Sequence, residues 1–213
     1  RQYAAADTIS TFNYEGIRLL PGRWQQQYED VKAFYLSLDP NAILHPFRRR
    51  AHPEGHAPGK SLGGAYGESA LGFGQWLAGM ARAAKVTNDD ALKRRTLYLM
   101  TEWGKTLDDD GYFGARLDGR PPDHYYYDKI VGGLVDIYEY LGDEKALEYL
   151  DRVTTWAENN LDRSNEYAWP REWYTVAENL YRAYELTGDQ RYYDFAKVWD
   201  YTHFWGALAE KRD

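Results

Sequence analysis

The stretch YEYLGDEKALEYL, residues 138–150, is nearly repeated further along as YELTGDQRYYDFA, residues 184–196. In both copies, apolar residues spaced as one helical face lead into the dipeptide Gly-Asp. Glycine suits the left-handed position that ends a helix, and aspartate suits the N-cap of the next helix. We therefore expect Gly142-Asp143 and Gly188-Asp189 to be the tight turns of two helical hairpins.

A looser third copy of this pattern comes earlier in the chain. An apolar face leads to Thr87-Asn88-Asp89, and a helix is expected from about residue 90 to 105. Asparagine tolerates the left-handed conformation. An opening helix is expected over about 25–38. Turns that recur roughly every 50 residues are typical of stacked helical hairpins, and no region is rich in strand patterns. The sequence therefore predicts an all-α fold, an (α/α) toroid of helical hairpins that forms an incomplete (α/α)6 barrel.

The predicted domain organisation is a single helical domain over residues 1–213. It consists of a leading segment, 1–62, and hairpins at about 64–107, 124–161 and 172–208. Six such hairpins would need roughly 300 residues at this repeat length. We therefore expect the chain to be the N-terminal part of a longer protein, with an open array of hairpins as the alternative.

The connections between the predicted hairpins are long and rich in aromatic residues and histidine. They are HPFRRRAHPEGHAPGKSLGGAYGES (45–69), LDDDGYFGARLDGRPPDHYYYD (107–128) and LDRSNEYAWPREWY (161–174). Because tight turns alternate with long loops, all the long loops should lie at one end of the array. Long loops without structure of their own are usually functional. We expect an aromatic-lined cleft at that end, with simple filling of gaps between helix ends as the alternative.

Composition and charge exclude several classes of protein. The formal net charge of −7 argues against nucleic-acid binding, and no stretch of about 18 apolar residues predicts a membrane span. The chain has no cysteine, so its own residues cannot form disulfides, thiolate zinc sites or a cysteine nucleophile. Its 20 Tyr and 8 Trp can fill a core or stack on a ligand such as a sugar. The acidic run at 107–111 lacks the ligand pattern of a calcium-binding loop, so we expect a turn there.

Several motifs together, in their order along the chain, resemble glycoside hydrolase family 127, which includes β-L-arabinofuranosidases. They are ILHPFRRRA (43–51), LGGAYGES (62–69), GFGQWLAGMARA (72–83), DGYFG (110–114), YYYDKIVGGLVDIYEYLGDEKAL (125–147) and ENLYRAYELTGDQRYYDFAK (178–197). The resemblance runs from about Arg18 to Lys197. It implies an N-terminal (α/α)6 barrel followed by β-sandwich domains. It also implies that the nucleophile, a zinc-bound cysteine in the later part of the barrel, lies outside this chain. Accordingly, no cofactor is expected within the chain, and zinc is expected only in a full-length homologue.

The resemblance also implies three substrate-binding positions. Family members often carry GHxxGHYL at the start of an inner helix, where this chain has ALGFGQWL, with Leu71 and Gln75 at the histidine positions. They often carry HK at the start of the next inner helix, where this chain has Asp128-Lys129. Glu178 matches a glutamate of the family. Gln75, Asp128 and Glu178 are therefore predicted to bind substrate, and capping or surface roles remain open for Asp128 and Glu178.

Three further candidates come from the long connections. His124 could bind substrate or titrate near neutrality, or could be a solvated loop residue. Tyr127 belongs to the tyrosine cluster beside it, and Trp173 belongs to the aromatic loop before the last hairpin. No catalytic residue and no metal ligand can be identified in the chain.

The leading functional hypothesis is a glycoside hydrolase of the β-L-arabinofuranosidase-like class, with this chain supplying part of the substrate cleft. The expected ligand is an oligosaccharide or polysaccharide, and the expected protein partner is the remaining part of the barrel or an oligomeric partner. One alternative is a polysaccharide lyase that uses His124 and Tyr125–Tyr127 for proton transfer. The other is a non-catalytic carbohydrate-binding module. The compartment stays open, with a periplasmic or secreted location preferred over the cytoplasm.

Overall fold

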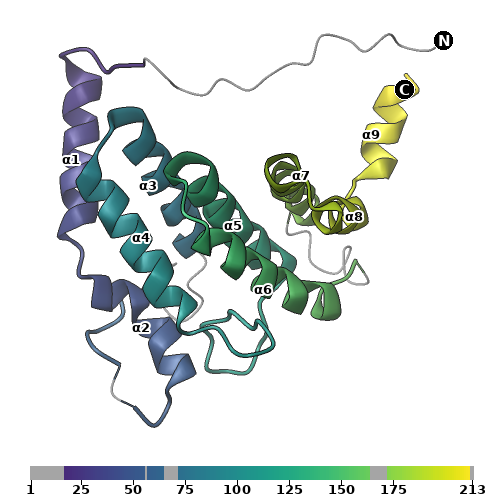
Figure 1. Cartoon of the computed structure of the whole chain (residues 1–213), viewed down its shortest axis with the longest axis horizontal. Coiled ribbons are helices and arrows are strands. Elements are labelled where there is room, and N and C mark those ends of the chain that lie inside the picture. The colour runs from purple at the N-terminus through teal and green to yellow at the C-terminus, as the bar shows by residue number, and fades with distance from the viewer. Residues whose placement is uncertain (1–16, 56, 65–71, 164–171, 212–213) are drawn as a thin grey trace.

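The computed structural model describes residues 17–55, 57–64, 72–163 and 172–211. All regular elements in these ranges are helices, and those from α3 to α8 form three successive hairpins (Figure 1). They are α1 (Arg23–Ser37), α2 (Pro40–Ala51), α3 (Gly72–Thr87), α4 (Asp90–Gly104), α5 (His124–Asp136), the π-helix η2 (Ile137–Leu141), α6 (Lys145–Asn160), the 3-10 helix η3 (Trp173–Thr175), α7 (Val176–Thr187), α8 (Gln190–Val198) and α9 (Thr202–Ala209). The predicted all-α toroid of helical hairpins is confirmed.

The two Gly-Asp turns have the geometry expected from the sequence. Gly142 and Gly188 adopt left-handed backbone conformations, with φ of 69° and 72°. The side chain of Asp143 accepts a hydrogen bond from the backbone N–H two residues later at 3.0 Å. Asp189 accepts the equivalent bond at 2.9 Å. Both glycines therefore end a helix. Asp189 is the predicted N-cap of α8, whereas Asp143 lies one residue before Glu144, which is the N-cap of α6.

The third turn uses asparagine in place of glycine. Asn88 has a φ of 52°, and Asp89 caps α4 by accepting hydrogen bonds from the backbone N–H groups of Ala91 and Leu92. Asparagine can occupy this left-handed position at a modest cost. This turn therefore joins α3 and α4 as the two arms of a hairpin.

The leading segment contains one helix more than expected. The prediction that the first long loop begins at His45 is wrong, because α2 extends over Pro40–Ala51. Asp39 caps this helix by accepting a hydrogen bond from Asn41 N–H at 2.9 Å, and a proline at the first helical position is favourable. Apolar side chains including Phe47 are buried on its inward face. His45 therefore lies on a helix, and the loop begins at His52.

Like ends of α3 and α5 lie together. Near their N-terminal ends, a Cβ atom added to Gly74 would lie 2.0 Å from the carbonyl oxygen of Lys129. Near their C-terminal ends, the guanidinium of Arg82 donates to the carboxylate of Asp136 at 2.6 Å. The two helices are therefore parallel. The missing side chain of Gly74 allows their backbones to approach closely.

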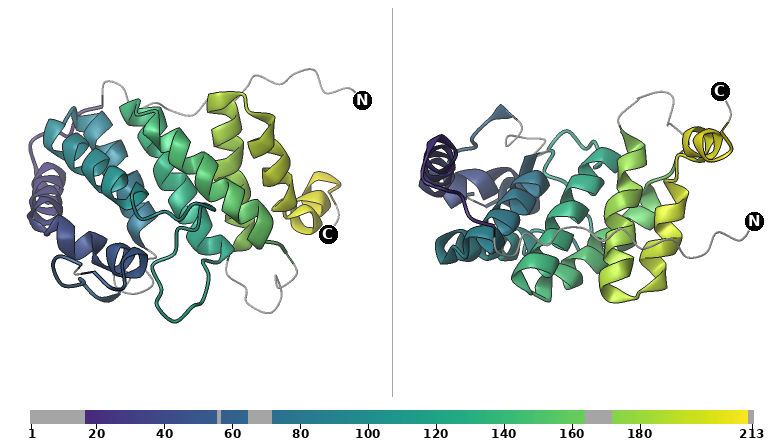
Figure 2. Two further views of the ribbon diagram at one scale, coloured as in Figure 1. Left: turned by 60° about the horizontal axis from the view of Figure 1, so that its bottom comes forward. Right: turned by 90° about the horizontal axis from the view of Figure 1, so that it is seen from above.

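Helix α7 continues this layer in the same direction. The hydroxyl of Thr175, just before α7, donates to the carboxylate of Asp128 at 2.9 Å. Farther along α7, Arg182 donates to Asp136 at 2.6 Å. We call α3, α5 and α7 the inner layer, and α4, α6 and α8 the outer layer (Figures 1 and 2). Each hairpin contributes one helix to each layer.

Because the inner helices are parallel, the long connections meet at one end of the array. The described parts of these loops lie together along the lower side of the left view in Figure 2, and the tight turns lie at the opposite end. In the loop between α4 and α5, Gly111 has a φ of 88° and donates its N–H to the carbonyl of Asp108 at 2.9 Å. The acidic run at 107–111 therefore forms the predicted turn.

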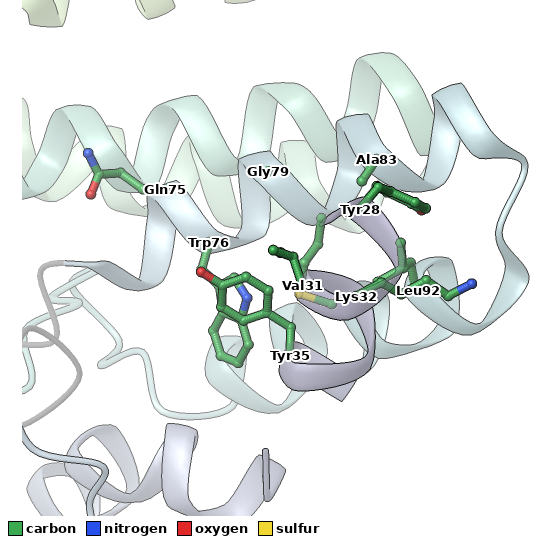
Figure 3. A pocket seen from close by; sticks show the side chains of 10 residues that line it. Tyr28, Val31, Lys32, Tyr35, Gln75, Trp76, Gly79, Ala83 and Leu92 are labelled. Atoms are coloured by element: carbon green, nitrogen blue, oxygen red, sulfur yellow. The ribbon is translucent and has the colours of Figure 1, made fainter. Parts of the chain in front are cut away.

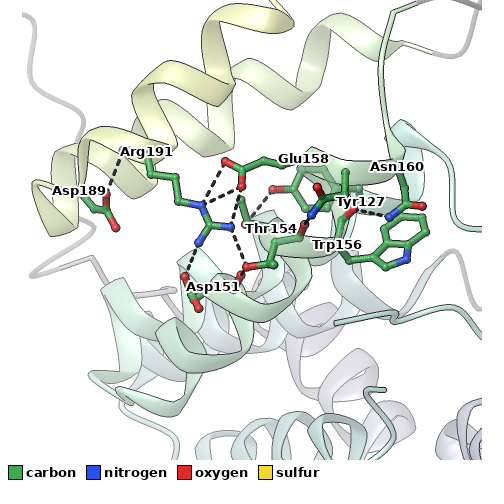
Figure 4. A network of polar contacts seen from close by, with 10 residues as sticks. Tyr127, Asp151, Thr154, Trp156, Glu158, Asn160, Asp189 and Arg191 are labelled. Atoms are coloured by element: carbon green, nitrogen blue, oxygen red, sulfur yellow. Dashed lines mark hydrogen bonds and ion pairs between the residues drawn. The ribbon is translucent and has the colours of Figure 1, made fainter. Parts of the chain in front are cut away.

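The outer layer is tied together by ion pairs as well as by its core. Arg191 on α8 donates to Glu158 on α6 at 2.8 and 3.0 Å, and it also pairs with Asp151 (Figure 4). The hydrogen bond to Glu158 is the main reason why the pKa of Arg191 is raised. Below this cluster, the hydroxyl groups of Tyr127 and Thr154 lie 2.9 Å apart and join α5 to α6.

The last described hairpin ends at Val198, and α9 follows as a separate helix after Trp199–Tyr201. Trp199 is fully buried, whereas Trp205 on α9 is 60% exposed. None of the helices in the described part of the chain has the length and apolar character needed to cross a membrane.

Candidate glycan-binding face

The candidate site is the side of the inner layer that faces away from the outer layer, called the inner face below. On α5, Tyr127 points toward α6, where its hydroxyl meets Thr154. Residues two or nine positions away lie on the opposite side of a helix. The corresponding positions on the three inner helices carry polar side chains: Gln75 and Arg82 on α3, Tyr125, Lys129 and Asp136 on α5, and Thr175, Glu178 and Arg182 at the start of and along α7.

Asp128 is the centre of a hydrogen-bonded cluster near the loop end of the inner face. Its side chain is only 1% exposed. The carboxylate accepts from the ammonium of Lys129 at 2.7 Å, from the hydroxyl of Thr175 at 2.9 Å and from the amide of Asn179 at 2.8 Å. A buried charge requires such partners. The acceptor capacity of Asp128 is thus used within the protein, and this predicted substrate-binding residue joins α5 to α7 instead of lying open to a ligand.

Lys129 is the member of this cluster that is nearest to solvent on α5. Its side chain is 17% exposed, and its ammonium lies 4.5 Å from the centroid of the Tyr125 ring. Burial lowers the pKa of this ammonium, but the hydrogen bond and the charge of Asp128 outweigh burial, so the pKa is raised above 10.5. Lys129 is therefore a fixed cation at neutral pH.

A second polar cluster lies toward the turn end of the inner face. The fully buried carboxylate of Asp136 accepts from Arg82 at 2.6 and 3.1 Å and from Arg182 at 2.6 Å. Burial lowers the pKa of Arg182, but its bonds to Asp136 and Glu139 outweigh this and raise the pKa. The π-helix η2 begins directly after Asp136, and Tyr140 within it lies 5.9 Å from the guanidinium of Arg82. Asp136 and Tyr140 are four residues apart, so both side chains lie on the side of this helical segment that faces Arg82.

Three of the predicted site residues lie on successive inner helices near the loop end. Gln75 is exposed on α3 and directly follows Gly74, which contacts the backbone of Lys129. Glu178 is exposed on α7, one turn after Thr175, which binds Asp128. Gln75, Asp128 and Glu178 are therefore brought to a common level of the inner face, although only Gln75 and Glu178 are exposed.

Tyr127 lies elsewhere, in the core. Its ring is fully buried, its hydroxyl is bonded to Thr154 at 2.9 Å, and the ring of Phe195 is 6.0 Å away. The helical repeat explains this position: Tyr125 and Tyr127 are two residues apart on α5, so their side chains point to opposite sides of the helix. The structure therefore places Tyr127 away from any surface that a substrate could contact.

His124 and Trp173 pack against residues that follow α8. The His124 ring lies 6.1 Å from the ring of Trp199. Trp173 is 7% exposed, with the Tyr201 ring at 5.0 Å and the guanidinium of Arg163 at 4.0 Å from its own ring. Both residues are at the loop end, but the structure associates them with an aromatic cluster at the edge of the array.

A cavity of about 340 Å³ lies between α1 and α3 (Figure 3). Its wall is formed mainly by aromatic and aliphatic side chains, among them Tyr28, Tyr35 and Trp76. Gln75 is at one end of this cavity, and its amide points away from Tyr35 and Trp76 in Figure 3. Gln75 thus lies both at the edge of this cavity and on the inner face.

The hydrogen-bond partners of Asp128 and Asp136 were not predicted from the sequence. Lys129, Thr175 and Asn179 surround the first carboxylate, and Arg82 and Arg182 surround the second. The sequence feature that could have predicted a polar face is the spacing of polar residues at intervals of three, four or seven within helices that are otherwise apolar. That spacing indicates a second, polar face, but it does not reveal which helices share it.

The zinc site implied by the family resemblance does not fit the residues of this chain. The sequence has no cysteine. Within the described ranges, no three His, Asp or Glu side chains are grouped closely enough to hold a metal ion. No chemical step through zinc is assigned to these residues.

Comparisons with known proteins agree on one family. A family model described as "Beta-L-arabinofuranosidase, GH127 catalytic domain" matches residues 16–213. Among solved structures, the chain resembles the crystal structure of Ara127N-Se, a GH127 β-L-arabinofuranosidase from Geobacillus stearothermophilus T6, with a TM-score of 0.59 and 15% sequence identity. The match covers 89% of this chain and 32% of that enzyme, so the chain spans about a third of its length. At this identity the likeness demonstrates a shared fold. The search of curated proteins gave no match.

Proposed function

Because the chain belongs to the GH127 β-L-arabinofuranosidase catalytic-domain family, we propose that it forms part of a glycoside hydrolase that acts on β-L-arabinofuranosides. In this proposal the inner face of α3, α5 and α7 lines the substrate cleft. The observation that carries the proposal is the common level of Gln75, the Asp128–Lys129 pair and Glu178 on three parallel helices at the loop end.

The inner face offers the groups that a sugar requires. Gln75 supplies an amide donor and acceptor, Lys129 supplies ammonium donors, and Glu178 supplies an acceptor for hydroxyl groups. Hydrolysis of a glycosidic bond also needs an acid and a nucleophile or base on either side of the bond. We assign these roles to residues of the enzyme beyond the described ranges, and we assign binding and orientation of the sugar to the inner face.

The positions of the tyrosines argue against the polysaccharide lyase alternative. A lyase would use His124 and Tyr125–Tyr127 to transfer protons, but Tyr126 and Tyr127 are buried. Burial is the main reason why the pKa of each phenol is raised far above 10.0. A buried phenol with such a pKa is a poor base at neutral pH.

The charges on the inner face also argue against the acidic polysaccharides on which such lyases act. Among the described side chains of this face, Lys129 is paired with Asp128, Arg82 is paired with Asp136, and Arg182 is paired with both Asp136 and Glu139. Glu178 adds a further negative charge. A uronate would therefore meet no uncompensated cation among these groups, whereas an uncharged sugar needs none.

The test is turnover and binding by the same protein. We expect the longer enzyme of which this chain forms part to release 4-nitrophenol from 4-nitrophenyl β-L-arabinofuranoside. In the same enzyme we expect Glu178→Gln to weaken binding of methyl β-L-arabinofuranoside by about tenfold, since a hydrogen bond to a charged group is lost. Glu148→Gln, an exposed change on the outer helix α6, is the matched control. Binding without turnover would favour the carbohydrate-binding module, and an unsaturated product from a polyuronate would favour the lyase.

A further inference from the structure

In the Asp128 cluster, one residue is enclosed and one is partly open to solvent. Asp128 can only hold other groups in place, whereas Lys129 can also touch a ligand. Asp128 is enclosed, and its two oxygens receive three donors that come from α5, from η3 and from α7. Removing this carboxylate from water is costly unless its partners are held in place. The cluster is therefore a rigid support, and the groups bonded to Asp128 are fixed relative to both helices.

Among the three partners of Asp128, Lys129 is the one that has further N–H donors for a ligand. An ammonium has three N–H donors. One donates to Asp128 at 2.7 Å, and the ring of Tyr125 lies on another side of the cation at 4.5 Å. Thr175 and Asn179, by contrast, are also engaged with Glu172 and Arg182. Lys129 is thus held by two neighbours and still presents N–H groups to the inner face.

The neighbours of Lys129 complete a set of sugar-binding groups. Gln75 lies beside it on α3, because Gly74 packs directly on the Lys129 backbone. Glu178 follows on α7, one turn beyond the residue that shares Asp128 with Lys129. A central donor with an amide on one side and a carboxylate on the other suits adjacent hydroxyl groups of one sugar ring.

We propose that Lys129 is a sugar-contacting residue of the cleft, that Asp128 and Tyr125 are its positioning residues, and that the ligand at this point is an uncharged sugar that accepts hydrogen bonds through its hydroxyl oxygens. This inference rests on the proposed function and specifies the chemistry of one position in the cleft. Asp128 neutralises Lys129, so the pair provides directed donors without a net charge. A sugar carboxylate would gain little here, because it would compete with Asp128 for the same cation.

The experiment measures binding of methyl β-L-arabinofuranoside and of tri-galacturonate by NMR titration of the whole chain. We expect the furanoside to bind more tightly than the uronate. We expect Lys129→Met to weaken furanoside binding about tenfold, and Lys129→Arg to recover part of the loss. The matched control is Lys93→Met, an exposed lysine change on the outer helix α4.

A second measurement tests whether Asp128 positions Lys129 or only stabilises the fold. In protein labelled with ¹³C at lysine Cε, Lys129 should titrate above ordinary lysine, and Asp128→Asn should lower its pKa and weaken furanoside binding. Asp194→Asn, an exposed change on α8, should leave both unchanged. Furanoside binding that Lys129→Met leaves intact would overturn this inference alone. Tighter binding of the uronate would overturn the choice of an uncharged ligand. Absence of furanoside binding by the unaltered chain would overturn the proposed cleft, and this inference with it.

Discussion

Asp136 on α5 and Arg82 on α3 form an ion pair with an Nε–Oδ2 distance of 2.6 Å, although they are 54 positions apart in the chain. The carboxylate is fully buried, and Arg182 of α7 approaches it from the other side at 2.6 Å. One side chain of the middle helix thus bonds to both neighbouring helices of the inner layer. These bonds join the three helices in the parallel arrangement that places the long loops at one end.

Asp136→Asn should therefore destabilise the fold. It leaves Arg82 without its charged partner, while Arg182 keeps Glu139. Because the Arg82 side chain is 46% exposed, the cost should be about 1–3 kcal/mol, less than that of breaking a fully buried ion pair. The measurement is the free energy of unfolding in urea. Asp194→Asn on the surface of α8 is the control, with an expected change within about 0.5 kcal/mol. A change of less than about 1 kcal/mol for Asp136→Asn would mean that the ion pairs of Asp136 contribute little to the free energy of unfolding.

Two glycines of α3 should respond in opposite directions to alanine. At Gly74 a Cβ would lie 2.0 Å from the Lys129 carbonyl oxygen and 2.6 Å from the Ile130 nitrogen, both backbone atoms, so α3 and α5 must separate. Gly74→Ala should lower the free energy of unfolding by about 1–3 kcal/mol or more. At Gly79 no atom lies within 4 Å of the added Cβ. Gly79→Ala should raise stability by about 0.5–1 kcal/mol. Thermal unfolding of both variants checks the pair, and equal effects would contradict the close packing at Gly74.

The left-handed turn at Gly188 should be sensitive to alanine for a different reason. No atom lies within 4 Å of a Cβ added there, but φ is 72°. An L-residue other than glycine in this conformation costs roughly 1–2 kcal/mol. Gly188→Ala should lower the free energy of unfolding by about that amount, and Gly188→Asn by less. A neutral Gly188→Ala would show that the turn can adopt another conformation.

Asp89 should make part of the stability depend on pH. Burial raises the pKa of this carboxyl, but the hydrogen bond from Lys32 and those from the N–H groups of Leu92 and Ala91 outweigh burial, so the pKa lies below its ordinary value of 3.8. A carboxyl with a depressed pKa contributes stability that is fully present above its unfolded pKa. That contribution is lost as pH falls below 3.8 and through the lower value of the folded state.

The measurement is urea unfolding of the wild type and Asp89→Asn between pH 7 and pH 2. The difference between them should be constant above about pH 5 and should disappear toward pH 2. Because Lys32 pairs with Asp89, Lys32→Met should reduce the difference. A difference that grows as the pH falls would have the wrong sign for this mechanism.

The candidate site was only partly predictable from the sequence. Gln75 and Glu178 were predicted from the motif positions of the family that the sequence resembles, and the structure leaves both exposed on inner helices; their role in binding stays a prediction. The burial of Asp128 and Tyr127 could not be predicted. A helical repeat states which residues share a side of one helix, but it contains no information on which neighbouring helix covers that side.

The local turns are what the sequence by itself determined. Gly142, Gly188 and Asn88 accept positive φ, and the aspartates that follow them accept hydrogen bonds from N–H groups two or three residues later, at the start of the next helix. These preferences belong to the residues themselves. They were sufficient to predict hairpins, and therefore the alternation of long and short connections. The exception was α2, because the stretch 45–69 was interpreted as a long connection from its start, whereas residues 45–51 belong to the helix despite Pro46 within it.

Only the tertiary structure decided which polar side chains meet. The partners of Asp136 come from positions 54 and 46 residues away, and those of Asp128 include residues 47 and 51 away. Their bonds exist because α3, α5 and α7 lie parallel at a spacing that Gly74 permits. Local preference acts over a few residues, whereas pairing of buried charges depends on the distance between helices, and that distance is set by the packing of the whole array.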